Sequence, residues 1–144
     1  VFTGPEDDGF RQHRIHSLKN AYFTGQKKVD ELPAYITAYD VCINPQMVND
    51  ITDGNYPLKI DEYLPMGKPT VATSTHTMRH IFADHTHLAS NPEEWLSAID
   101  RAVTEADDKE LAKQRIAFAE THSWGHSVKK IYGIIDNFLK EKAT

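Results

Sequence analysis

Lys59 and Glu62 lie three residues apart at the start of a short helical pattern, and together they could bind a phosphate and a sugar. The preceding Gly-Asn-Tyr-Pro sequence, residues 54–57, supplies a flexible backbone and then a proline suited to a first helical turn. The amides of Leu58, Lys59 and Ile60 are expected to be unpaired there. With the helix dipole and the lysine, such amides favour an anion, most naturally a phosphate.

Glu62 has two interpretations. Its carboxylate lies about one helical turn after Lys59, so both side chains could face one crevice, where the carboxylate would accept hydrogen bonds from sugar hydroxyls beside a phosphate. A nucleotide presents that combination. Alternatively, Glu62 only complements the helix dipole and pairs with Lys59, for about 0.3–0.5 kcal/mol. The residues by themselves leave both interpretations open.

Strand and helix patterns alternate along the chain, which predicts the elements that would position this site. Strand patterns occur at residues 1–4, 21–25, 41–45, 70–73 and 87–89, and helical patterns at 29–39, 57–66, 77–82 and after Pro92. The alternation predicts an α/β fold, a Rossmann-like parallel sheet with helices on both faces. The helix that begins near Pro57 would follow the carboxyl end of strand 41–45, the edge where open α/β sheets bind ligands. The polar stretch 46–55 between them is long enough to be a functional loop.

Two further local signals mark helix ends. Gly67, followed by Pro69, is typical of a glycine helix stop. Ser123 is a suitable N-cap for a closing helix with an apolar stripe that runs from Val128 to Leu139. That stripe could lie on a membrane surface.

Length and composition exclude several classes of protein. A chain of 144 residues favours one domain over residues 1–144. A net charge of −5 with mixed signs argues against a nucleic-acid partner. The lone Cys42 argues against a disulfide framework and fits a reducing cytoplasm. The chain opens with Val1 and reads as a strand that runs into a turn, so we expect a piece of a longer protein, truncated at its N-terminus.

Eight histidines raise the question of a metal site. The close pairs are His76 with His80, His85 with His87, and His122 with His126. No H-E-x-x-H or C-x-x-C motif accompanies them, and zinc needs three or four convergent ligands, so we expect structural or solvated histidines and no metal. His76 follows the end of a strand and is a further candidate for contact with a bound sugar or phosphate.

Residues 56–73 closely resemble a pattern in GT-B glycosyltransferases, in the carboxyl-terminal, donor-binding domain of the large retaining family four, the group 1 glycosyl transferases. The resemblance covers nearly the whole chain. The other matching segments follow in the same order: residues 22–26, the helix through Glu31 and Leu32, residues 40–45, and Ser123-Trp124.

This resemblance implies a domain that holds a nucleotide-diphospho-sugar against an amino-terminal acceptor domain of the same protein. Transfer would retain the anomeric configuration and need no metal ion or other cofactor. The full-length protein would be a cytoplasmic hexosyltransferase of polysaccharide biosynthesis, with peripheral membrane contact at the inner face as a further expectation. The apolar stripe of the closing helix would pack against the acceptor domain. The chain by itself would be inactive.

The family's binding residues carry over only in part. Glu62 matches the second glutamate of the Glu-(seven residues)-Glu motif, which usually binds the nucleotide ribose, whereas the first glutamate falls at Gly54. Asp53 or Asn55 could substitute for it. The basic pair that stabilises the departing diphosphate is expected upstream of this chain, so no catalytic residue is assigned. The candidate nucleotide-sugar-binding set is Gly25, Gln26, Gly54, Asn55, Tyr56, Leu58, Lys59 and Glu62, with Gly25 and Gln26 near the base or ribose, and Leu58 and Lys59 near the diphosphate.

Two other functions stay open. The missing first glutamate would suit a binding module that holds a nucleotide sugar without transferring it. A sugar-nucleotide epimerase could use the same architecture. A phosphorelay receiver is set aside, because no clustered acidic residues close an early strand.

Overall fold

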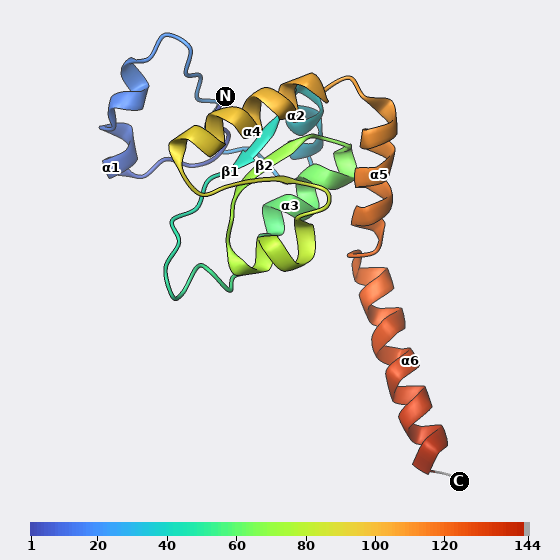
Figure 1. Ribbon diagram of the computed structural model, residues 1–144. Coiled ribbons are helices and arrows are strands. Elements are labelled where there is room, and N and C mark those ends of the chain that lie inside the picture. The colour runs from blue at the N-terminus through green and yellow to red at the C-terminus, as the bar shows by residue number, and fades with distance from the viewer. Residues whose placement is uncertain (143–144) are drawn as a thin grey trace. The chain divides into compact units, whose positions relative to one another are not determined.

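The computed structural model describes residues 1–142 and divides the chain into two compact units, Val1–Tyr35 and Ile36–Thr144, each of which is described by itself. The single domain over residues 1–144 stays a prediction. The elements are α1 (Asp8–Arg11), η1 (Arg14–Ser17), α2 (Leu32–Ala38), β1 (Cys42–Asn44), α3 (Leu58–Tyr63), η2 (Leu64–Met66), β2 (Thr70–Thr73), the π-helix η3 (Met78–Phe82), β3 (His87–Ala89), α4 (Pro92–Thr104), α5 (Lys109–Glu120) and α6 (Trp124–Lys142) (Figure 1).

The second unit contains a three-stranded parallel sheet in the order β1-β2-β3. Cys42 is paired with Thr70 and Val71 with His87, so all three strands end at the same edge. The three strands lie within the predicted segments, and the α/β, Rossmann-like fold class is confirmed.

Side chains of the central strand alternate between two cores, one on each face of the sheet. Val71 packs with Ala89, Ala98 and Ala102, which come from β3 and α4. Ala72 points the other way and packs in a second core, whose other buried members are Ile60, Leu64, Met78, Phe82 and Ala119. Helices therefore cover both faces, as the doubly buried strand TVAT requires.

The two strands expected in the first unit are shorter than predicted. Residues 1–4 and 21–25 make only an isolated parallel bridge between Phe2 and Phe23, with the two rings stacked at 5.0 Å between centroids. The pairing is brief because both segments end at glycines with positive φ, Gly4 at 149° and Gly25 at 69°. Because the backbone turns away at the glycine that ends each segment, the two segments cannot continue their pairing.

Two predicted helices differ in detail. The pattern over residues 29–39 becomes α2, which begins only at Leu32, because a turn precedes it in which the Glu31 carboxylate accepts from the Lys28 amide at 2.9 Å. The short helix expected at 77–82 is the π-helix η3. Irregular helical turns of this kind often occur beside functional sites.

Helix α6 closes the chain with an exposed apolar stripe. Its start is capped as predicted, since the Ser123 hydroxyl accepts from the His126 amide at 3.2 Å. No residue of α6 is buried, although it carries Val128, Ile131, Tyr132, Ile134, Ile135, Phe138 and Leu139. No helix within residues 1–142 is long and apolar enough to cross a membrane.

Candidate functional site

Helix α3 stands at the carboxyl edge of the sheet, directly after the loop that leaves β1. Ile60 and Leu64 are fully buried and hold the helix against the sheet. Pro57 is the residue just before the first helical turn, one position earlier than expected, and is buried. The order strand, loop and helix start is confirmed, and it presents the first turn of α3 at the edge where ligands bind in such folds.

The backbone at this helix start is less open than predicted. The Leu58 amide donates to the Tyr56 carbonyl at 3.1 Å, and the Ile60 amide donates to the Pro57 carbonyl at 2.9 Å. The expectation of three unpaired amides is therefore wrong for two of them, because the tight turn at Pro57 brings local carbonyls within reach. An anion here would depend on the Lys59 side chain more than on the backbone.

Lys59 and Glu62 are both exposed, and no salt bridge joins them within residues 1–142. The interpretation of Glu62 as a mere partner of Lys59 thus finds no support in the geometry. Both side chains are accessible to a ligand. Their spacing of three residues places both side chains on one side of α3, next to the side that carries the buried Ile60.

The loop before α3 is tied to the end of β2. The Gln46 amide donates to the Thr73 hydroxyl at 2.8 Å, and the Asp53 carboxylate accepts from the amide of His76. Within the loop, Asn49 Oδ1 accepts from the amides of Ile51 and Thr52. This ten-residue polar segment is therefore an ordered part of the sheet edge.

The remaining candidate residues fall in both units. Gly54 and Asn55 are exposed at the end of the loop, and a Cβ on Gly54 would meet no atom within 4 Å. Gly25 and Gln26 belong to the first unit, and Gly25 has the left-handed backbone that favours glycine. Gly54, Asn55, Tyr56, Leu58, Lys59 and Glu62 are brought together by the start of α3.

A cavity of about 600 Å³ adjoins this helix start and was not predicted. Tyr56, Leu58 and Asp61 form one wall, and the junction of α5 and α6 forms the other with Thr121, His122, Trp124, His126, Ser127 and Lys130. No local motif marks such a cavity. The one feature of the sequence that could have indicated the cavity is Trp124, a large aromatic residue directly after the helix cap Ser123.

Tyr56 is held in place in this cavity by a hydrogen bond from its hydroxyl to Asp61 Oδ1 at 3.1 Å. Partial burial, this hydrogen bond and the negative charge of Asp61 all raise the pKa of Tyr56 well above its ordinary value. The phenol therefore stays protonated and acts as a donor at any physiological pH.

Among the three close histidine pairs in the sequence, His76 and His80 make a ring contact, whereas His85 and His122 each lie against Phe118. The rings of His76 and His80 lie 4.2 Å apart between centroids, and His87 pairs with Glu105 at 3.0 Å. Among the described residues, no group of three or more histidine, cysteine or carboxylate side chains could hold an ion.

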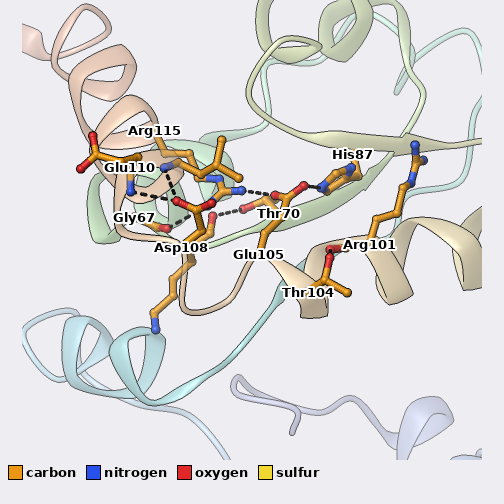
Figure 2. A network of polar contacts seen from close by, with 11 residues as sticks. Gly67, Thr70, His87, Arg101, Thr104, Glu105, Asp108, Glu110 and Arg115 are labelled. Atoms are coloured by element: carbon orange, nitrogen blue, oxygen red, sulfur yellow. Dashed lines mark hydrogen bonds and ion pairs between the residues drawn. The ribbon is translucent and has the colours of Figure 1, made fainter.

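A polar network lies at the opposite, amino edge of the sheet (Figure 2). Arg115 is buried and hydrogen bonds to Glu105, whose other oxygen lies 3.0 Å from His87, and it also donates to the Gly67 carbonyl at 3.4 Å. It joins α5, the end of α4 and the start of β3. The network lies at the other end of the strands from the start of α3 and links elements that are distant in sequence.

The fold and the position of the helix start define the class of protein: an α/β protein with the Rossmann-like architecture of GT-B domains. Within that class, the chain belongs to the family of glycosyl transferases group 1, whose model matches residues 1–105. A relative from Bacillus subtilis (strain 168), named "Putative teichuronic acid biosynthesis glycosyltransferase TuaH", is 26% identical in an alignment of 138 residues that covers 91% of this chain. The chain spans 34% of that relative's length.

Proposed function

We propose that this chain is the donor-binding domain of a glycosyltransferase that moves a hexose from a nucleotide-diphospho-sugar to an acceptor with retention of configuration. Lys59 would contact the diphosphate and Glu62 the ribose. The acceptor would belong to a cell-surface polysaccharide, a class suggested by the name of the Bacillus subtilis relative. No metal or other cofactor is required in this proposal.

The observation that carries the proposal is the exposure of Lys59 and Glu62 on one side of α3, at the carboxyl edge of a parallel sheet, without a salt bridge between them. A cationic side chain can attract a diphosphate, and a carboxylate can accept hydrogen bonds from ribose hydroxyls. The membership of the chain in the group 1 family supports the same assignment.

Calorimetric titration of the 144-residue chain with UDP, GDP, ADP, CDP and dTDP tests the proposal. One of these nucleotides should bind saturably, and Lys59→Ala and Glu62→Ala should each weaken it about tenfold or more. Lys109→Ala and Glu93→Ala, at exposed positions on α5 and α4, are matched controls that should bind as the parent does. No binding by a folded chain, or equal loss in the controls, would contradict the proposal.

A second candidate function is a module that binds a nucleotide sugar without transferring it. It is favoured by Gly54 at the position of the first motif glutamate and by Asp53, whose carboxylate already accepts from the His76 amide. An epimerase-like domain is the other alternative. Transfer of radiolabelled sugar by the full-length protein, with the 144-residue chain alone as the expected inactive control, distinguishes transfer from both.

The proposed partner of this chain is the amino-terminal acceptor domain of the same protein, docked on the apolar stripe of α6. The stripe supports the proposal because large apolar side chains such as Ile131 and Phe138 are more than half exposed. The alternative is that the apolar stripe of α6 contacts the surface of a membrane. We place the full-length protein in the cytoplasm, where a reduced and buried Cys42 would be stable.

A further inference from the structure

The cavity between α3 and α6 adjoins the proposed donor site: Tyr56 and Leu58 of the candidate set line it, whereas the two charged residues of that site do not. Leu58 and Asp61 are three residues apart and face the cavity, whereas Lys59 and Glu62, also three apart, do not line it. Since successive helical residues are turned by about 100°, α3 presents two neighbouring sides, one to each site. A ligand in the cavity would sit next to a donor bound at Lys59 and Glu62.

Two aromatic rings that line the cavity are packed against the hydrophobic core. Tyr56 and His122 each lie 5.6 Å from the ring of Phe82, which is fully buried. His122 is held further by its Nδ1, 3.0 Å from the Thr121 hydroxyl. Because these rings are already packed, less conformational entropy is lost when a ligand binds in the cavity.

The rim combines an aromatic face with groups that pair with hydroxyls. Trp124 is 87% exposed although it is among the largest apolar side chains in the chain. Asp61 offers carboxylate oxygens, Ser127 a hydroxyl and Lys130 an ammonium group. A pyranose ring has an apolar C–H face and a girdle of hydroxyls, so this set of groups matches it on both counts.

We propose that this cavity is a saccharide subsite, in which Trp124 stacks on one sugar ring while Asp61, Ser127 and Lys130 hydrogen bond to its polar groups. The subsite rests on the proposed function and extends it, because it would hold a sugar unit of the acceptor glycan next to the donor. Acceptor recognition would then belong in part to this chain.

Saturation-transfer NMR on the 144-residue chain tests the subsite with the methyl glycosides of glucose, N-acetylglucosamine and glucuronic acid as probes. At least one probe should receive saturation at its ring C–H protons, with a dissociation constant in the millimolar range. Trp124→Ala should weaken binding about tenfold, the size of one well-placed aromatic contact, and Lys130→Gln about threefold.

Two matched controls lie on the same helix outside the cavity. Tyr132→Ala removes another exposed aromatic ring, and Lys129→Gln another lysine, so both variants should bind the probes as the parent does. No binding of any probe, or binding that Trp124→Ala and Lys130→Gln leave unchanged, would overturn the subsite.

The failure of the subsite is separable from that of the donor site. Glu62→Ala should weaken nucleotide binding about tenfold or more and leave the sugar signals intact. If nucleotide binding were lost in Trp124→Ala to the same degree as in Glu62→Ala, the cavity would belong to the donor and the subsite would be overturned.

Discussion

The carboxylate of Asp53 accepts a hydrogen bond of 2.7 Å from the backbone amide of His76, across 23 residues of sequence. The Asp53 carbonyl also accepts from the amide of Thr77 at 3.3 Å. One residue therefore fastens the loop before α3 to the turn after β2. These two hydrogen bonds hold the polar loop in one conformation up to α3, although Gly54 and Asn55 in it are exposed.

Asp53→Asn should loosen this loop. The amide side chain is a weaker acceptor than the carboxylate, so we expect the free energy of unfolding to fall by about 1 kcal/mol. The proposed nucleotide affinity should fall about threefold, because the start of α3 is less well positioned. Urea unfolding and calorimetry measure the two effects. Asp50→Asn, an exposed position in the same loop, should change neither, and equal effects of both variants would refute the fastening role.

Arg115→Met should be among the most destabilising substitutions in the second unit. The buried guanidinium bonds to Glu105 and to the Gly67 carbonyl, and its removal leaves that carbonyl and one oxygen of Glu105 without this donor. We expect a loss of about 1.5–3 kcal/mol in urea unfolding, the range for hydrogen bonds to charged groups. Arg101→Ala, at an exposed position on α4, should change stability by less than about 0.5 kcal/mol. A small effect of Arg115→Met would show that the network is dispensable.

Gly67→Ala should destabilise the chain for two separate reasons. Gly67 has φ of +70°, which costs a residue with a side chain about 1–2 kcal/mol. In addition, a Cβ there would lie 3.0 Å from Cβ of Ala112 on α5, a buried contact that must shift. The thermal midpoint of unfolding should fall by several degrees. Gly133→Ala, inside α6 with open space around it, should instead raise helix content, so a loss there would contradict the reasoning.

Alkaline pH should destabilise the second unit. Burial raises the pKa of the Cys42 thiol from 9.0 to about 11, and burial followed by nearby negative charge raises that of Tyr63 from 10.0 to about 12. Between these values the unfolded chain binds fewer protons than the folded chain, so the free energy of unfolding falls as the pH rises above about 9. Below about pH 9 both groups are protonated in both states, and this contribution is fully present.

Urea unfolding between about pH 8 and pH 10.5 measures this decline. Cys42→Ala should show a shallower decline than the parent, because the proton of the Cys42 thiol no longer contributes. The native thiol should also react slowly with iodoacetamide at neutral pH and rapidly in urea, since it is buried and protonated. A parent midpoint that stays constant over this range would contradict the linkage.

Local pattern was enough to predict the strands of the sheet and the helix stop at Gly67. The runs VCIN and TVAT are short and bounded by breakers, and both form parallel strands. TVAT is buried throughout as its pattern indicates, whereas in β1 only Cys42 is buried and Ile43 is exposed. The Ser123 cap and the start of α3 depend on contacts within a few residues. The family resemblance rested on such segments, and the match of the group 1 model over residues 1–105 bears it out.

Only the tertiary structure shows which residues from distant parts of the sequence come into contact. The cavity at Tyr56 and Trp124 joins residues 68 positions apart, and Arg115 reaches Gly67 across 48. The periodicity of the sequence cannot predict such contacts, because they depend on how the helices pack over the sheet. The amides of Leu58 and Ile60 were expected to be unpaired, yet the turn at Pro57 pairs them locally. Sequence thus determined which residues stand at the ligand edge, and packing determined which groups remain available there.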